Sequence, residues 1–174
     1  MTSRTITRLA ALVSAVVLGS ASPSTAQVVE ISPDQAALRV RYEKGPRVVL
    51  FYSYGCPYSR EAFPDFLALA RRYAPEGVSF LAFSLDDDPE ILDAYLGRDM
   101  LPFDRQLILP EGPGSIGRAF AAENISVPAR ASTPSVVVIG PDDRIVGQVA
   151  GTSGPRRAEG WLRQLGLTPS STVE

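Results

Sequence analysis

Five short runs of apolar, β-branched and aromatic residues recur along the chain, separated by longer amphipathic segments. The runs predict strands at Arg47–Ser53, Val78–Leu85, Gln106–Leu109, Ser135–Ile139 and Arg144–Ala150. The last two runs flank Gly140-Pro141-Asp142-Asp143, a turn-forming sequence that is typical of a hairpin. The pattern therefore predicts a sheet that includes an antiparallel pair.

The segments between the strands carry helical signals. They predict helices at Pro33–Arg41, from the Gly55–Ser59 turn to Tyr73, at Glu90–Leu96, at Ser115–Ala122 and at Pro155–Leu165. Two of these helices begin with a capping residue followed by proline, Ser32-Pro33 and Asp88-Pro89, because proline has no N–H to leave unpaired in the first turn. The alternation of strands and helices predicts a three-layer α/β domain with a mixed sheet.

The first residues of the chain have a different pattern. Arg4 and Arg8 precede the apolar stretch Leu9–Gly19, and Ser24-Thr25-Ala26 supplies small residues at the −3 and −1 positions of a cleavage site. The apolar stretch is shorter than the roughly 20 residues that span a bilayer. We therefore expect a secretion signal peptide at 1–26, a globular domain at 27–167 and a flexible tail at 168–174. The alternative is that the first segment is retained as an N-terminal anchor.

Composition limits the chemistry that is open to this protein. The 174 residues, 45% of them apolar and 21% charged, suit one globular domain. The formal net charge of −2 and the lack of a long basic run argue against nucleic-acid binding. There is no histidine, which excludes Cys-His and Ser-His-Asp nucleophiles and His-ligated metal sites. The single cysteine excludes an internal disulfide, so the chemistry must use carboxylates, hydroxyls or one thiol.

The single cysteine stands where a helix is expected to begin. Cys56 directly precedes Pro57, so its sulfur should lie at a helix N-terminus, where unpaired N–H groups and the macrodipole favour an anion. Such a thiol commonly has a pKa below the free value of about 8.5, and the thiolate is the nucleophile. Ser59 can donate a hydrogen bond to this sulfur but cannot form a disulfide with it. Tyr54 and Tyr58 indicate a partly exposed tip; the alternative is that Cys56 is an ordinary buried thiol.

Two segments of the chain match a known pattern. Segment 48–66 reads V-V-L-F-Y-S-Y-G-C-P-Y-S-R-E-A-F-P-D-F, and Ala131-Ser132-Thr133-Pro134 stands directly before the apolar run S-V-V-V-I-G. Together they resemble the active-site helix and the cis-proline loop of the thioredoxin superfamily, most closely the extracytoplasmic TlpA-like thioredoxins. Arg60, Glu61 and Pro64 match that family's basic residue, acidic residue and helix proline. The resemblance implies a thioredoxin fold: a central mixed β-sheet flanked by helices, with an extra strand–helix insertion.

The resemblance also assigns roles to residues. It implies that Cys56 and Ser59 occupy the two catalytic positions and that the peptide bond between Thr133 and Pro134 is cis and lies next to Cys56. It further implies a substrate-binding surface formed by Tyr54, Pro57, Tyr58, Thr133 and Pro134.

The chain departs from its relatives in ways that change the expected mechanism. Ser59 replaces the resolving cysteine, so the dithiol cycle cannot run within one subunit, and Leu50 stands where thioredoxins carry a buried acid. C-P-Y-S also resembles the glutaredoxin C-P-Y-C sequence without its second thiol, which implies a glutathione-dependent monothiol route. The spacing of Ser53 and Cys56 resembles that of peroxiredoxins, but Val49 replaces their proline, so a peroxidase is disfavoured.

We therefore expect a periplasmic or secreted thiol–disulfide exchange protein, with no stable membrane insertion once the signal peptide is removed. Its single nucleophilic cysteine would serve disulfide isomerisation, reduction or deglutathionylation of partner proteins. The expected partners are protein thiols or disulfides and a membrane or periplasmic reductant. No metal or cofactor is expected, and glutathione or another external thiol would be a co-substrate. The alternative is a non-catalytic thioredoxin-fold binding module or a chaperone-like partner-docking protein.

Three consecutive aspartates, at 86–88, form the most acidic segment of the chain. Oxygen-ligated cations need six or more convergent ligands, and Asp88 is already expected to cap a helix. We therefore expect Asp86 and Asp87 to face water.

Overall fold

The computed structural model describes residues 28–96, 103–104, 106–112, 114–127 and 132–171. The predicted signal peptide and the last three residues of the predicted tail lie outside the described residues. In chain order the elements are β1 (Val29–Ile31), α1 (Pro33–Tyr42), β2 (Arg47–Tyr52), α2 (Pro57–Tyr73), η1 (Ala74–Glu76), β3 (Ser79–Ser84), α3 (Pro89–Leu96), β4 (Gln106–Ile108), α4 (Ser115–Ala122), β5 (Ser135–Ile139), β6 (Ile145–Ala150) and α5 (Gly154–Gln164).

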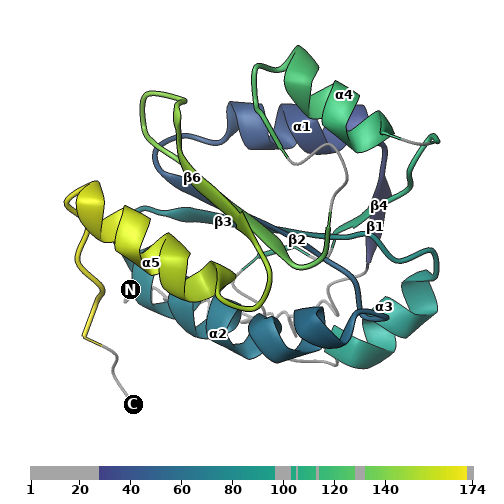
Figure 1. Cartoon of the computed structure of the whole chain (residues 1–174), viewed down its shortest axis with the longest axis horizontal. Coiled ribbons are helices and arrows are strands. Elements are labelled where there is room, and N and C mark those ends of the chain that lie inside the picture. The colour runs from purple at the N-terminus through teal and green to yellow at the C-terminus, as the bar shows by residue number, and fades with distance from the viewer. Residues whose placement is uncertain (1–27, 97–102, 105, 113, 128–131, 172–174) are drawn as a thin grey trace, which may run out of the picture.

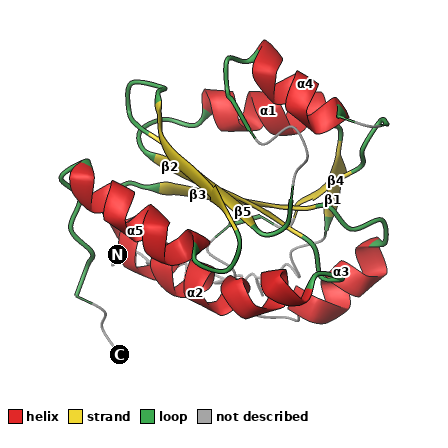
Figure 2. Ribbon diagram, viewed as in Figure 1, coloured by secondary structure: helices red, strands yellow, loops and turns green. Residues whose placement is uncertain are grey.

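The strands form one six-stranded sheet in the order β1-β4-β3-β2-β5-β6. β2 pairs with β3 in parallel and with β5 in antiparallel orientation, and β5 forms the predicted hairpin with β6. Figure 1 shows α1 and α4 on one face of this sheet and α2, α3 and α5 on the other. The three-layer α/β domain with a mixed sheet is therefore confirmed (Figure 2).

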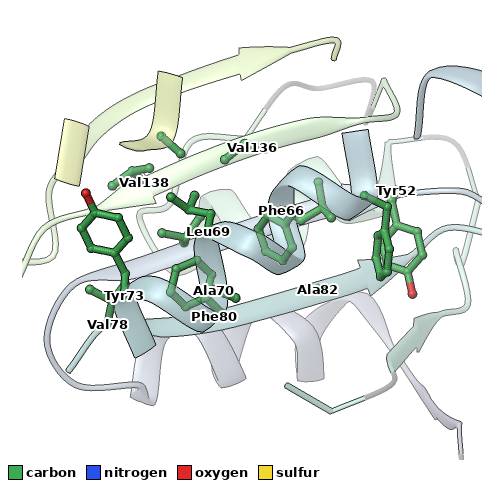
Figure 3. Packing of buried hydrophobic residues seen from close by; sticks show 14 of the residues in the cluster. Tyr52, Phe66, Leu69, Ala70, Tyr73, Val78, Phe80, Ala82, Val136 and Val138 are labelled. Atoms are coloured by element: carbon green, nitrogen blue, oxygen red, sulfur yellow. The ribbon is translucent and has the colours of Figure 1, made fainter. Parts of the chain in front are cut away.

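The central strand β2 separates two apolar cores. Because successive side chains of a strand point to opposite faces, Val48, Leu50 and Tyr52 pack toward α2 and α5, whereas Val49 and Phe51 pack toward α1 and α4. Figure 3 shows the first core, in which Phe66 of α2 packs in one cluster with Val136 of β5 and Ala82 of β3. Every residue of β2 is buried, which explains why its sequence is apolar on both faces.

The helix starts follow from local sequence. Ser32 accepts the backbone N–H of Gln35, and the Gln35 side chain accepts the N–H of Ser32, which completes a capping box before Pro33. The Asp88 carboxylate accepts the N–H of Glu90 at the start of α3. Both proline-marked helix starts are therefore confirmed.

Two elements were not predicted from the sequence. β1 has only three residues and pairs in parallel with β4 at the sheet edge, and η1 is a single turn that is followed by Gly77. Neither carries a periodic pattern long enough to be recognised from residues alone. No helix among the described residues is long and apolar enough to cross a membrane.

Candidate functional site

The connection from β2 to α2 is a tight turn that places the cysteine. The backbone N–H of Cys56 donates to the carbonyl of Ser53 at 3.1 Å, which closes a four-residue turn. Cys56 has an extended backbone, with φ −87° and ψ 116°, and is the N-cap of α2, while Pro57 is the first helical residue. The sulfur therefore lies at the N-terminus of a 17-residue helix, as the Cys-Pro sequence predicts.

Residues 132–134, which directly precede β5, lie at the same end of the sheet. Phe51 and Ser135 are partners in the antiparallel pairing of β2 with β5, so the residues that precede Ser135 lie beside the end of β2. The Thr133–Pro134 peptide bond is cis. The thiol of Cys56 donates to the carbonyl oxygen of Thr133 at 3.1 Å, although the two residues are 77 positions apart.

Ser59 lies beneath the turn rather than at the surface. Its side chain is only 2% exposed, and its hydroxyl oxygen accepts the backbone N–H of Ser53 at 3.2 Å. The Ser59 hydroxyl uses its oxygen to accept this N–H, so its hydrogen is still available for donation. The Cys56 sulfur is within hydrogen-bonding reach of the hydroxyl. Ser59 therefore both supports the turn and supplies a donor to the sulfur.

The pKa of the Cys56 thiol is held below its usual value by hydrogen bonds. Burial by itself raises this pKa, but the Thr133 side chain, the backbone and side chain of Ser59 and the backbone of Tyr58 lower it by a larger total. The Thr133 carbonyl acts in the opposite sense, since it accepts a proton that only the neutral thiol carries. The donors prevail, so the thiolate, which is the nucleophilic form, is more favoured here than in an unperturbed cysteine.

The residues next to Cys56 in the chain differ in their exposure. Tyr58 is 63% exposed, Pro57 is exposed and Tyr54 is half-buried. The guanidinium of Arg60 lies 5.4 Å from the centre of the Tyr54 ring and donates to the Tyr54 carbonyl at 2.7 Å. The expected partly exposed tip is thus present, with Cys56 itself half-buried within it.

The expectation that Asp86 faces water is wrong. Asp86 follows β3, and because β3 pairs in parallel with β2, its side chain meets the turn that follows β2. Its carboxylate accepts the hydroxyl of Ser53 and the N–H of Tyr54, each at 2.8 Å, and the N–H of Gly55 at 3.3 Å. The hydroxyl of Ser84 is a fourth donor. A carboxylate directly after a buried strand was the sequence signal that could have indicated this contact.

These hydrogen bonds determine the ionisation of Asp86. Partial burial raises the pKa of its carboxyl group, but the donors from Ser84, Tyr54, Ser53 and Gly55 lower it further, so the pKa lies below the usual value. Asp87, by contrast, is exposed, as expected.

The structure thus brings Cys56, Ser59 and Thr133 into one site by hydrogen bonds and places Pro134 directly beside them in the chain. Within the described ranges, no group of three or more His, Cys, Asp or Glu side chains is placed to hold a metal ion.

Comparisons with known proteins identify the fold. No protein-family model matches the sequence, and no curated protein matches it. Among solved structures, a thioredoxin-family thiol:disulfide interchange protein from Chlorobium tepidum TLS superposes with a TM-score of 0.52 at 17% identity, covering 73% of this chain and 83% of its own. A DsbF homologue from Corynebacterium diphtheriae gives a TM-score of 0.55 at 14% identity, covering 72% and 75% of the two chains.

A third solved structure is a secreted Mycobacterium tuberculosis disulfide oxidoreductase homologous to E. coli DsbE. It superposes with a TM-score of 0.50 at 18% identity, covering 70% of this chain and 82% of its own. At these identities the likeness concerns the backbone, and it shows that the chain has the thioredoxin fold.

Proposed function

We propose that this thioredoxin-fold protein is an extracytoplasmic thiol–disulfide exchange protein in which Cys56 is the only nucleophile. The observation that carries the proposal is the placement of the Cys56 sulfur at the N-terminus of α2, in contact with the loop of Thr133 and Pro134. The lowered pKa of this thiol supports the proposal, because a larger fraction is thiolate near neutral pH.

The first chemical step is a thiol–disulfide exchange. The Cys56 thiolate attacks one sulfur of a partner's disulfide, a new S–S bond forms between them, and the other partner sulfur leaves as a thiolate. If the partner is glutathionylated, glutathione is the leaving thiolate when the protein sulfur is attacked, and the partner's own thiolate leaves when the glutathione sulfur is attacked. The donors around Cys56 stabilise its thiolate. They therefore favour ionisation before the attack and, later, the departure of the Cys56 thiolate when the mixed disulfide is cleaved.

Release of the mixed disulfide must come from outside the subunit. Ser59 holds the position of a resolving thiol, and its hydroxyl cannot accept the S–S bond. A second thiol of the partner can attack the mixed disulfide, which gives isomerisation. Alternatively, two molecules of an external thiol such as glutathione act in sequence. The first releases the partner as a thiol and leaves glutathione bound to Cys56, and the second frees the Cys56 thiolate and leaves as glutathione disulfide, which gives net reduction. The proposal therefore includes an external thiol as co-substrate.

The substrate chain would dock across the surface that carries the sulfur. Backbone groups of Thr133 are proposed to pair with an extended segment of the partner, in front of Pro134. The exposed faces of Tyr58 and Pro57 and the half-buried ring of Tyr54 would contact its side chains. Disulfide-bearing proteins are thus the proposed substrates, recognised through backbone and apolar contacts.

The proposed location outside the cytoplasm rests on the N-terminal sequence. Arg4 and Arg8 followed by Leu9–Gly19 form a secretion-signal pattern, and one solved structure of the same fold is a secreted protein. Disulfides of client proteins also persist in such compartments rather than in the cytosol.

A non-catalytic binding module is the second candidate, and the buried Ser59 is the observation that favours it. With a hydroxyl at this position, a mixed disulfide at Cys56 has no internal route of release. The same surface around Tyr58 and Thr133 would then hold a partner without turnover.

Catalysed isomerisation separates the two candidates. A protein substrate with mispaired disulfides is incubated with reduced glutathione and either the wild-type protein or the C56S variant. We expect native pairing to be recovered faster with the wild type, because only it has a nucleophilic sulfur. Equal rates would overturn the exchange function, and a stable complex with the substrate at equal rates would establish the binding module.

A further inference from the structure

The turn that precedes Cys56 has its backbone groups held by side chains from two other elements. Asp86, after β3, accepts the N–H groups of both Tyr54 and Gly55, while Arg60, on α2, donates to the carbonyl of Tyr54. The anionic group thus meets the N–H side of the Tyr54 residue and the cationic group meets its carbonyl. Both ends of this residue's backbone are therefore tied to charged side chains.

The two carboxylate oxygens of Asp86 accept two hydrogen bonds each. Oδ1 accepts the Ser53 hydroxyl and the Gly55 N–H, whereas Oδ2 accepts the Tyr54 N–H and the Ser84 hydroxyl. Each oxygen therefore holds one backbone N–H of the turn and one serine hydroxyl. A group that accepts at both oxygens is needed to keep both N–H groups satisfied.

The Ser53–Gly55 turn also determines where the Cys56 sulfur lies. The N–H of Cys56 donates to the Ser53 carbonyl, and the N–H of Ser53 donates to the Ser59 hydroxyl, so any loosening of the turn reaches both catalytic positions. Because Asp86 occupies the N–H groups of the turn, the backbone donors toward the sulfur are those of the helix start, at Tyr58 and Ser59.

We propose that Asp86 is a positioning residue for Cys56, which holds the Ser53–Gly55 turn so that the sulfur stays among the donors of α2 and beside Thr133. This inference rests on the proposed function, in which the Cys56 thiolate is the reacting group. Asp86 acts through the turn and touches neither the sulfur nor the substrate.

The substitution Asp86→Asn tests this role with little change in shape. An amide has one acceptor oxygen, so in either orientation its NH2 group faces one backbone N–H of the turn, and one of the two bonds is lost. Asp87→Asn is the matched control. It removes the same charge from the neighbouring residue, whose side chain is exposed and does not hold the turn. Comparison of the two separates positioning from the loss of charge.

The readout is the rate of alkylation of Cys56 by iodoacetamide across a range of pH, measured on the full folded chain. We expect the wild-type midpoint to lie below that of a cysteine in an unfolded peptide and the Asp86→Asn midpoint to move up toward it. If the displaced sulfur loses one hydrogen bond that stabilises its thiolate, the alkylation rate at neutral pH falls by about fivefold. Asp87→Asn should keep the wild-type profile.

Two results would overturn the proposal, and they differ. If Asp86→Asn lowers only the denaturant concentration of unfolding and keeps the wild-type pH profile, Asp86 is structural and the proposed function stands. If the wild type itself has an ordinary cysteine midpoint, the proposed function fails and the positioning role fails with it.

A second variant covers the case in which Asp86→Asn does not fold. Arg60→Met removes the donor to the Tyr54 carbonyl and keeps an apolar stem against the ring. It should raise the Cys56 midpoint in the same direction, and an unchanged profile in this variant would likewise count against control of the sulfur by the turn.

Discussion

At the scale of single residues, the presence of serine instead of cysteine at position 59 determines which steps of thiol–disulfide exchange this site can complete. Ser59 is buried under the turn and hydrogen-bonded to the Ser53 N–H, so it has the place of a resolving thiol but only the capacity of a hydrogen-bond donor and acceptor. Cys56 is half-buried and so more accessible than Ser59. In the proposed exchange, Cys56 attacks the partner's disulfide and Ser59 supports the turn that holds it.

The variant Ser59→Cys should convert Cys56 and position 59 into a dithiol that can reduce disulfides. The new thiol is three residues from Cys56 in the first turn of α2, so we expect an internal disulfide under oxidising conditions and catalytic disulfide reduction with an external reductant. Thiol counting after oxidation and a turnover assay check both results. The double variant C56S/S59C is the control, because its one thiol is buried and has no partner. Failure to form the disulfide would show that the two side chains do not share the helix start.

Asp86 should give the protein a recognisable dependence of stability on pH. Because its pKa is lowered in the folded state from 3.8, its hydrogen bonds stabilise the fold fully above about pH 4 and lose this effect as the pH falls through the folded-state pKa. We expect the free energies of unfolding of the wild type and Asp86→Asn to differ at neutral pH and to converge as the pH falls below 4. Denaturant unfolding at several pH values measures this, and parallel curves would contradict it.

At the scale of elements, β6 and α5 pack closely because Gly147 has no side chain. A Cβ on Gly147 would lie 2.2 Å from Cε2 of Trp161, which means that the indole ring of α5 rests directly on the backbone of β6. Gly154, at the start of α5, approaches Val136 of β5 in the same way, with 2.7 Å between a Cβ and the nearest methyl. The hairpin and the last helix are thus packed through glycines, and the ion pair of Arg72 with Glu159 joins the same helix to α2.

Two alanine substitutions on this pair of elements should have opposite effects. Gly147→Ala forces the Trp161 ring away and should lower the free energy of unfolding by about 1–3 kcal/mol. Gly160→Ala, on the exposed side of α5 with no atom within 4 Å of its new Cβ, should raise it by about 1 kcal/mol, because alanine favours the helix. Denaturant unfolding of both variants checks the pair; a neutral Gly147→Ala would mean that the ring can move without cost.

At the scale of the whole molecule, the site forms where segments from distant parts of the chain end at one edge of the sheet. The carboxyl ends of the parallel strands β2 and β3 lie next to each other, and the antiparallel β5 begins at the same edge. The turn of Cys56, the carboxylate of Asp86 and the loop of Thr133 therefore converge, which is the place where α/β sheets commonly carry function. The two cores on either face hold this edge in place.

The proposed export of the protein concerns the whole chain and gives a separate prediction. Ser24 and Ala26 frame a cleavage site, so the secreted protein should begin at Gln27. Mass spectrometry of protein recovered from the extracytoplasmic fraction measures this end directly. A mature chain that still carries residues 1–26 would show that the first segment is an anchor instead.

The sequence by itself determined most of the helices and strands and the position of the Cys56 thiol at a helix start. Capping residues followed by proline, apolar runs and the Cys56-Pro57 pair act over a few residues, so each could be interpreted where it stands. These local signals predicted the helices, five of the six strands and the sulfur at a helix start. The pairing of that sulfur with Thr133 came from the resemblance of two segments to one fold.

Only the tertiary structure decided the order of the strands, the addition of β1 and the role of Asp86. Asp86 meets Gly55 across 31 residues because β2 and β3 pair in parallel in one register, and nothing near Asp86 in the chain records that pairing. As a member of an acidic run it had the appearance of a solvated side chain. Contacts of this kind follow from which strands lie together, and strand pairing depends on the free energy of the whole sheet and its two cores rather than on the residues of any one segment.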